Sequence, residues 1–491
     1  MTTPELIADR AGSSSANTPK DTQKAAEQAT PAAAVERAWP GHGRRPPEGE
    51  GAAGDTGGAL RFITCGSVDD GKSTLIGRLL VDSKAVLQDH LAGVTRAGEA
   101  DLALLTDGLS AEREQGITID VAYRYFSTEA RKFIIGDAPG HEQYTRNMVT
   151  AASQADAAVV LVDATKLDWA RPDLKLLAQT RRHSLLLQLL RVPSIVFAIN
   201  KLDAVADPAP AFTHIQGALQ AFAANAGIAI TAVVPVSALK GWNVVDFGHE
   251  QAGWCGYSGP TLLEILERLP VTPRETALPP AFPVQWVEKF SSSSDTSQGR
   301  RVFWGRVAAG ELAPGTAVQV LPSGQQAVVA QVLDHARQPR NVGAGHSAGI
   351  VLDREVDISR GDWIVAAPTV AEAADDDFDA PAPQSPWPAR RELPATVAWM
   401  DDEPLVPGRV YWALHGHRWV KAKVKQITER LDIHTLAREA ATQLEPNAIG
   451  HIELVLQEAI PVAPFATSRL LGSLILVDTA SHKTAGAVLV R

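Results

Sequence analysis

The chain has only two cysteines among its 491 residues, Cys65 and Cys255, and it has no long hydrophobic run. A secreted chain of this size more often carries a disulfide framework, so we expect a reducing compartment, the cytoplasm. The most apolar stretch, Ser184 to Asn200, is interrupted by Gln188, Arg191 and a proline. Because a membrane-spanning helix needs about 20 apolar residues, we expect no membrane span.

An excess of positive charge is also missing. The chain has 46 Lys and Arg residues against 56 Asp and Glu residues, which gives a formal net charge of −10. Binding to nucleic-acid phosphates requires clustered Lys and Arg side chains, so this balance disfavours broad nonspecific nucleic-acid binding. The hydrophobic share of 45% is enough for a sizeable core, and the length suggests roughly three domains.

Large apolar side chains are scarce in residues 1–58, which are rich in Ala, Ser, Thr, Pro and Gly. This segment has neither the hydrophobic core of a signal peptide nor the Arg-rich, acid-poor composition of a transit peptide. It buries too little surface to offset the entropy lost on ordering. We expect a disordered tail, either simply solvated or serving as a docking arm.

A glycine-rich loop follows the first apolar segment after this tail. Residues 60–65, LRFITC, predict a short strand, and Gly66 to Ser73, GSVDDGKS, match the phosphate-loop pattern G-x-x-x-x-G-K-[ST] before a helical pattern. In such a loop, successive backbone amides and the helix N-terminus face phosphate groups. We expect Lys72 to contact the β- and γ-phosphates and the Ser73 hydroxyl to bind Mg²⁺. Taken alone, the loop is also compatible with a glycine-rich turn before a helix.

A second segment, RKFIIGDAPGH at Arg131 to His141, places polar residues after a buried strand. An Asp at this point, Asp137, can hold Mg²⁺ through water, and the Gly140 amide can bond to a γ-phosphate. Its position after the phosphate loop, in order and at a sensible distance, disfavours the reading of that loop as a simple glycine-rich turn.

A third segment, SIVFAINKLD at Ser194 to Asp203, supplies groups that fit a guanine base. The Asp203 carboxylate can accept hydrogen bonds from the N1–H and the 2-amino group of guanine, which adenine does not offer. The Asn200 amide complements this edge, and the Lys201 stem can pack along the base. A later strand ends in the small pair Ser237–Ala238, which can lie close to the base.

Between the phosphate loop and the second segment lies EREQGITID, Glu112 to Asp120. Thr118 is the candidate second side-chain ligand of Mg²⁺ in the triphosphate state. A loop of this kind is ordered by the γ-phosphate and Mg²⁺ and is released after hydrolysis. The alternative is an ordinary turn entering a strand over residues 117–126, ITIDVAYRYF.

The motif order GSVDDGKS, EREQGITID, DAPGHEQYTRNM, NKLD and SAL resembles the translation-factor superfamily of GTPases. Within it, residues 101–148 closely resemble the large GTPase subunit of bacterial ATP sulfurylase, subunit 1 of sulfate adenylyltransferase. The later segments YSGPTLLEILE, FPVQWV, VLPSG and DISRGD also match. The pair Asp69–Asp70 is part of this resemblance, since elongation factors usually carry His at the position of Asp70. The resemblance covers nearly all of residues 60–491.

The resemblance implies a function. Such subunits pair with a smaller catalytic subunit that transfers AMP from ATP to sulfate, which gives adenosine 5′-phosphosulfate and pyrophosphate. GTP hydrolysis on the large subunit drives this uphill transfer, so the present chain would hold the GTPase site and not the adenylyl-transfer site. His141 fits the position that orients the attacking water in relatives; the alternative is an ordinary polar loop histidine.

The expected cofactors are GTP and Mg²⁺, and the motifs with the resemblance define the site. The expected catalytic residues are His141, Lys72 and Thr118, and the expected metal ligands are Ser73, Thr118 and, through water, Asp137. The expected nucleotide contacts are Gly66, Ser67, Val68, Asp69, Asp70, Gly71, Lys72, Ser73, Thr74, Asp137, Ala138, Pro139, Gly140, His141, Asn200, Lys201, Asp203, Ser237 and Ala238.

The expected fold is an α/β P-loop GTPase domain followed by two small β-barrel domains, as in elongation factor Tu. Alternating strand and helix patterns support the first part, and short β-rich runs between Gly and Pro turns support the barrels. The expected boundaries are 1–58 for the tail, 59–275 for the GTPase domain, 276–368 for the first barrel, 369–392 for an acidic, Pro-rich linker and 393–491 for the second barrel.

The chain departs from the family in several places. DAPG replaces the commoner DTPG, so Ala138 removes a hydroxyl and raises the alternative of a scaffold that binds GTP without hydrolysing it. Two insertions, residues 165–178 and 291–305, are expected to be loops. A third reading is an elongation factor that carries tRNA, which the acidic balance disfavours. A fused kinase, found in some relatives, would need a second phosphate loop after Arg391, and we expect no kinase activity.

Overall fold

The computed structural model describes residues 58–84, 95–96, 99–100, 102, 118, 120–141, 144–247, 253–289, 301–368, 385–432 and 435–491. The tail predicted for residues 1–58 lies outside these residues, apart from Gly58. The same is true of residues 369–384 of the predicted linker and of most of the segment around Thr118.

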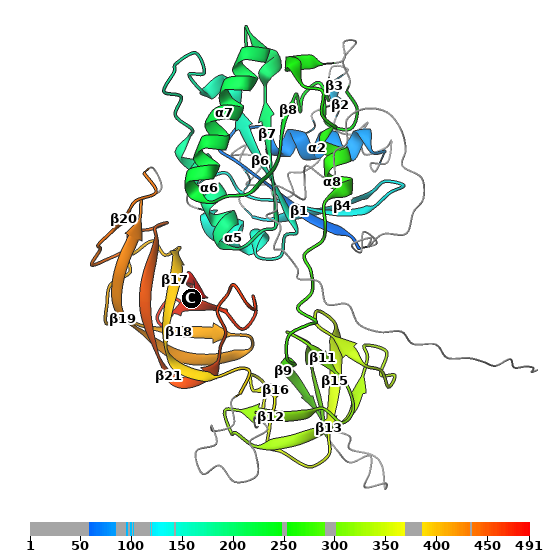
Figure 1. Cartoon of the computed structure of the whole chain (residues 1–491), viewed down its shortest axis with the longest axis vertical. Helices are drawn as coiled ribbons and strands as arrows, with labels where there is room; N and C mark the ends of the chain where they lie inside the picture. The colour runs from blue at the N-terminus through cyan, green and yellow to red at the C-terminus, as the bar shows by residue number, and fades with distance from the viewer. Residues whose placement is uncertain are drawn as a thin grey trace, which may run out of the picture. The chain divides into compact units, whose positions relative to one another are not determined.

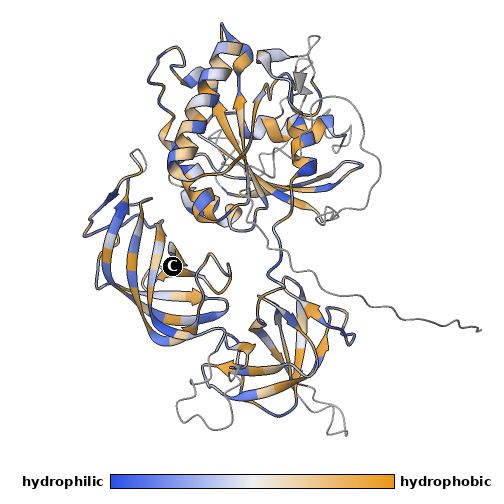
Figure 2. Cartoon of the chain, in the orientation of Figure 1, coloured by the Kyte–Doolittle hydropathy of each residue, from blue (hydrophilic) through white to orange (hydrophobic). Residues whose placement is uncertain are grey.

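A six-stranded sheet forms the centre of the first domain (Figure 1). The strand order is β4-β5-β1-β6-β7-β8, and all neighbours are parallel except β4, which runs antiparallel to β5. The bounds are β1 (Leu60–Cys65), β4 (Ala122–Ser127), β5 (Lys132–Asp137), β6 (Ala157–Asp163), β7 (Ser194–Asn200) and β8 (Ile230–Val236). Strands β6 and β7 are buried along their whole length, as expected for parallel strands covered on both faces. Figure 2 shows these central strands as hydrophobic.

Helices cover both faces of this sheet, with α5, α6 and α7 on one face and α2 and α8 on the other (Figure 1). The helices are α2 (Lys72–Asp82), α5 (Thr145–Ala152), α6 (Ala178–Leu189), α7 (Pro208–Ala226) and α8 (Leu262–Arg268), with 3-10 turns η3 (Ala164–Lys166), η4 (Leu202–Ala204) and η5 (Trp254–Gly256). Two short strands, β2 (Thr95–Arg96) and β3 (Glu99–Ala100), pair with each other. Among the described helices, none combines the length and the apolar character that a membrane crossing requires.

The parallel arrangement places the carboxyl ends of five strands at one edge of the sheet. The register pairs Asp163 at the end of β6 with Asn200 at the end of β7, and Asn200 with Val236 at the end of β8. Ligands of open α/β sheets bind at this edge. The loops that follow β1, β5, β6, β7 and β8 therefore meet at one site.

The next part of the chain is a closed barrel with the order β10-β15-β13-β12-β16-β9. Its strands are β9 (Ala281–Glu288), β10 (Val302–Arg306), β12 (Ala317–Leu321), β13 (Gln326–Leu333), β15 (Ser347–Leu352) and β16 (Trp363–Ala366), with the short pair β11 (Glu311–Leu312) and β14 (Val342–Gly343) beside it. This confirms the predicted barrel. The expected loop at residues 291–305 is wrong at its end, because Val302 to Gly305 pair with β9 and β15 as part of β10.

The last part of the chain is a second antiparallel sheet, in the order β18-β22-β23-β17-β21-β19-β20. An additional pairing of β18 with β19 joins six of these strands into a closed ring, as the predicted second barrel requires. The strands are β17 (Ala389–Trp399), β18 (Val410–His415), β19 (Arg418–Leu431), β20 (Arg438–Glu439), β21 (Ile449–Pro461), β22 (Ser473–Asp478) and β23 (Thr484–Val490).

Two strand starts differ from the sequence-based expectation. Strand β17 begins at Ala389, inside the segment predicted as linker. The sequence did not indicate this start, because the first four residues, ARRE, are exposed and show no alternation of apolar and polar side chains. Strand β4 begins at Ala122 instead of residue 117, and Asp120 lies in a bend before it. Asp120 accepts a hydrogen bond from the Val121 amide at 2.7 Å, a local bond that competes with sheet pairing.

Candidate functional site

The loop Gly66–Ser73 connects β1 to α2, as the motif predicts. The loop turns through left-handed backbone at Asp69 (φ 63°) and Gly71 (φ 93°), the second being the residue before the helix. Lys72 begins the helix with its side chain buried, and its Nζ donates to the carbonyl of Ser67 at 2.7 Å. Burial lowers the pKa of Lys72, while the nearby carboxylates of Asp137 and Asp70 oppose this effect. The loop therefore holds an ammonium group inside a curve of backbone at a helix N-terminus, where an anion binds.

Asn200 and Lys201, at the end of β7, bond directly to the phosphate loop. Asn200 donates from Nδ2 to the carbonyl of Asp70 at 2.8 Å and accepts at Oδ1 from the Ala238 amide at 3.0 Å. Lys201 donates from Nζ to the carbonyl of Asp69 at 2.5 Å. Two hydrogen bonds thus join the segment predicted to bind the base to the loop predicted to bind the phosphates.

Asp203 and Ser237 are brought together through Lys240. The Lys240 ammonium lies 3.5 Å from Oδ2 of Asp203, and its backbone amide donates to the Ser237 hydroxyl at 3.2 Å. The same ammonium lies over the ring of Trp242, 4.5 Å from the centroid. A carboxylate and the Ser237–Ala238 backbone therefore line the end of the site next to Asn200.

Asp137 at the end of β5 meets the first helix. Its Oδ2 accepts from the Ser73 hydroxyl at 3.2 Å, and its Oδ1 accepts from the Thr64 hydroxyl at 3.1 Å. A carboxylate and a hydroxyl are hard oxygen ligands of the kind that Mg²⁺ prefers, so these residues fit the expected metal. Thr118 itself is described, but most of the segment around it lies outside the described residues.

Gly140 packs directly against the phosphate loop. A β-carbon at this position would lie 2.5 Å from Nζ of Lys72 and 2.9 Å from the carbonyl oxygen of Gly66, so a larger residue would displace one of the two loops. The Gly140 carbonyl accepts from Nε2 of Gln179 on α6 at 3.2 Å. A movement of the Gly140 loop would therefore change its contacts with both the phosphate loop and α6.

The residues around Gly140 differ in exposure. Ala138 and Pro139 are buried, and the Ala138 amide donates to the carbonyl of Thr64 at 3.1 Å. His141 is half-buried, and its ring centroid lies 6.1 Å from that of Tyr144. Thr74 is half-buried in the first turn of α2. Ala138 is therefore held next to the end of β1, and Thr74 follows the phosphate loop in α2.

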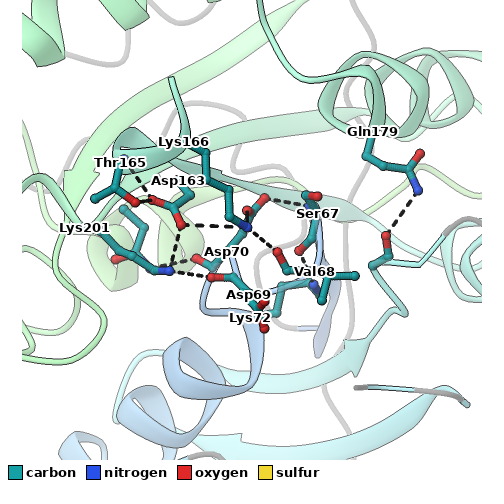
Figure 3. A network of polar contacts seen from close by, with 12 residues as sticks. Ser67, Val68, Asp69, Asp70, Lys72, Asp163, Thr165, Lys166, Gln179 and Lys201 are labelled. Carbon is teal, nitrogen blue, oxygen red and sulfur yellow. Dashed lines mark hydrogen bonds and ion pairs between the residues drawn. The ribbon is translucent and has the colours of Figure 1, made fainter. Parts of the chain in front are cut away.

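Two residues that the motifs did not identify, Asp163 and Lys166, complete the site (Figure 3). Buried Asp163 accepts from Nζ of Lys201 at 2.7 Å and from the amide and hydroxyl of Thr165 at 2.9 and 2.6 Å. Burial opposes its ionisation, but these hydrogen bonds outweigh burial and lower the pKa of Asp163. Lys166 forms an ion pair with Asp70, with Nζ 3.0 Å from Oδ1. The signal was present in the sequence, because DATK directly follows the apolar strand AAVVLV at the ligand-binding edge.

Two family models match the chain: the elongation factor Tu GTP-binding domain over residues 58–271, and the eEF1A C-terminal domain-like family over residues 392–491. Several relatives carry the name sulfate adenylyltransferase subunit 1. The protein of Laribacter hongkongensis is 40% identical over 89% of this chain and 86% of its own length. The protein of Methylorubrum extorquens (strain PA1) is 43% identical over 88% and 87%.

A longer relative, the bifunctional enzyme CysN/CysC of Xylella fastidiosa, is 45% identical over 87% of this chain, which spans 65% of that protein. Among solved structures, the chain matches Sup35 complexed with GDP at 21% identity, over 88% of this chain and 93% of that one, with a TM-score of 0.36.

Proposed function

The chain belongs to the sulfate adenylyltransferase subunit 1 family, and from this premise we propose that it hydrolyses GTP to drive sulfate activation by a partner. The partner is a smaller catalytic subunit that transfers AMP from ATP to sulfate in the cytoplasm, with adenosine 5′-phosphosulfate and pyrophosphate as products. The membership confirms the resemblance seen in the motifs.

The observation that carries the proposal is the hydrogen bonding between the segment predicted to bind the base, Ser194 to Asp203, and the phosphate loop. Asn200 and Lys201 hold the carbonyls of Asp70 and Asp69, while Asp203 lies on the next turn of chain. A guanine held by Asp203 thus has its phosphates directed at the loop amides. This arrangement supports guanosine phosphates as the ligand.

For hydrolysis, each part of the site has a role. Lys72 would contact the β- and γ-phosphates, and Ser73, with Asp137 through water, would hold Mg²⁺, which would neutralise phosphate charge. Half-buried His141 follows the Gly140 loop and orients the attacking water. Thr118 adds a further metal ligand in the triphosphate state.

Coupling to the partner follows from the position of Gly140. Its amide bonds to the γ-phosphate, and its carbonyl accepts from Gln179 on α6 at 3.2 Å. Loss of the γ-phosphate therefore moves the Gly140 loop and changes the contact of this loop with α6. The partner senses this change. Transfer of AMP to sulfate is strongly uphill, so a coupled hydrolysis is needed to carry it forward.

A second candidate, a scaffold that binds GTP without hydrolysing it, is favoured by Ala138. This residue is fully buried beside the phosphate loop and carries no hydroxyl. The Ala138 amide donates to the Thr64 carbonyl, so the backbone of this loop is held in place without a side-chain oxygen at position 138.

The test is co-purification of the full chain with its partner from the native cell, followed by two assays. GTP hydrolysis is measured with and without ATP and sulfate, and product formation is measured with GTP or with a non-hydrolysable analogue. We expect ATP and sulfate to stimulate hydrolysis, and product formation to require GTP itself. Binding without turnover would select the scaffold, and GTP-dependent capture of tRNA would revive an elongation-factor function.

A further inference from the structure

We propose that Lys166 is a positioning residue of the nucleotide site. It stabilises the phosphate loop on the side opposite the phosphates by neutralising the buried carboxylate of Asp70. The inference rests on the proposed binding of a guanine nucleotide. Lys166 belongs to none of the nucleotide-binding motifs and lies in the short turn η3, after β6.

The Asp70 carboxylate is fully buried inside the phosphate loop, next to the place where phosphates are expected to bind. Its Oδ2 accepts from the Ser67 amide at 2.6 Å, and its Oδ1 lies 3.0 Å from Nζ of Lys166. Burial raises the pKa of Asp70, whereas the hydrogen bond and the charge of Lys166 lower it. A buried charge that loses its partner is strongly destabilising.

Lys166 also completes a row of backbone contacts. Three consecutive carbonyls, those of residues 68 to 70, accept hydrogen bonds from Lys166, Lys201 and Asn200, in that order. Because the C=O and N–H of one trans peptide point in opposite directions, the amides of residues 69 to 71 are aimed away from these side chains. The amide of residue 70 makes a long bond of 3.4 Å to the Ser67 carbonyl. Successive amides on one side form a cavity for an anion.

The contact with the carbonyl of residue 68 places the Lys166 ammonium on the back of the loop, away from the amides. Its side chain remains 32% exposed, while that of Asp70 is 0% exposed. Lys166 therefore acts on the nucleotide through Asp70 and the backbone and makes no contact of its own with the phosphates.

The charges at the back of the loop form an alternating series (Figure 3). Lys166 lies between Asp70 at 3.0 Å and Asp163 at 3.8 Å, and Asp163 in turn pairs with Lys201 at 2.7 Å. These two carboxylates and two ammonium groups balance each other, and Lys72 adds a further positive charge near Asp70. Loss of Lys166 makes the back of the loop more negative by one charge, beneath amides that must bind the negative phosphates, so nucleotide affinity should fall.

The experiment uses the full chain and fluorescently labelled GDP and GTP. Lys166→Met removes the charge and keeps the length, Lys166→Arg keeps the charge, and Asp70→Asn with Lys166→Met removes both charges. Lys175→Met is the matched control, an exposed lysine nine positions further along the same segment. Melting temperature without nucleotide is measured for each variant, so that loss of fold is distinguished from loss of affinity.

We expect Lys166→Met to weaken binding of both nucleotides by about 10- to 100-fold, since the uncompensated Asp70 charge opposes phosphate binding. Lys166→Arg should stay within about 3-fold of the wild type, because the positive charge beside Asp70 is kept. The double variant should recover to within about 5-fold, because a neutral amide replaces the unpaired charge. Lys175→Met should bind as the wild type does.

Two outcomes would overturn the inference. One is unchanged affinity in Lys166→Met. The other is a double variant as weak as Lys166→Met, which would mean that Lys166 contacts the nucleotide directly. Failure of the wild-type chain to bind either nucleotide refutes the proposed function instead, so the two failures are distinguishable. If Lys166→Met does not fold, the double variant and Lys166→Arg still decide the question.

Discussion

The side-chain amide of Asn200 lies 2.8 Å from the carbonyl oxygen of Asp70, and this bond ties the end of β7 to the phosphate loop across 130 residues of sequence. The same side chain accepts from the Ala238 amide, so it joins three loops at the ligand-binding edge of the sheet. Both bonds are buried, so solvent does not readily replace either of them.

The first prediction concerns this amide. Asn200→Ala leaves a carbonyl and an amide unsatisfied in a buried site, at a cost of about 1–3 kcal/mol each. We expect a lower melting temperature and at least about 100-fold weaker GDP binding, because the loop loses its fixed position. Differential scanning fluorimetry and a nucleotide titration measure the two effects. Asn225→Ala, at an exposed position of α7, is the control and should change neither.

The site was predictable from sequence where one local pattern carries both structure and chemistry. The apolar run 60–65, the phosphate loop Gly66 to Ser73 and the helical pattern after it predict a strand, a loop and a helix as well as a phosphate site, and the structure has β1, the loop and α2 in that order. Asp137 and Asn200 were identifiable because each ends an apolar strand. The carboxyl ends of parallel strands meet at one edge, so these residues had to lie together.

The remaining parts depend on contacts between distant residues. The Asp70–Lys166 pair spans 96 positions, and nothing in either local pattern indicates that the two charges meet. The start of β17 could not be predicted from sequence for a different reason, since four exposed residues precede its first buried residue. Strand β4 is shorter than its β-branched sequence suggests because Asp120 forms a local bond to the next amide.

The second prediction concerns the buried ammonium of the phosphate loop. Lys72→Ala removes the cation that Asp70 and Asp137 surround, and we expect triphosphate binding to fall by about 100-fold or more because charge-assisted bonds to phosphate are strong. Formation of adenosine 5′-phosphosulfate by the complex should collapse with it. Lys132→Ala, at an exposed position of β5, should leave both unchanged. If the Lys72 variant still drives product formation with the partner present, the coupling mechanism is wrong.

The third prediction concerns base selectivity. Asp203→Asn exchanges an acceptor pair for one acceptor and one donor group, which suits the 2-oxo group of xanthine better than the 2-amino group of guanine. We expect GTP affinity to fall by about 10- to 100-fold and xanthosine triphosphate to compete more strongly. Competition of the two triphosphates against labelled GDP measures this. Asp207→Asn, at an exposed position before α7, serves as the control; equal preference in both variants would remove Asp203 from the base site.

The fourth prediction concerns the second barrel. Its His415 is fully buried, with Nε2 donating to the Leu471 carbonyl at 3.2 Å and its ring stacked on Trp363 at 4.9 Å. Burial lowers the pKa of His415 from 6.5 to about 4. Between these values the unfolded chain binds a proton that the folded chain does not, so stability rises with pH across this window and falls on acidification. The full loss below pH 4 amounts to about 3 kcal/mol.

His415→Phe keeps an aromatic ring against Trp363 and removes the titrating group. It should lower stability at pH 7 by about 1 kcal/mol, because the Leu471 carbonyl loses its donor, but it should also reduce the fall in stability between pH 7 and pH 4.5. Urea unfolding at the two pH values measures both terms. His335→Asn, an exposed histidine of the first barrel, should keep the wild-type pH dependence. A His415→Phe variant with the same acid sensitivity as the wild type would show that other groups, such as buried His183 with its pKa of about 3, account for it.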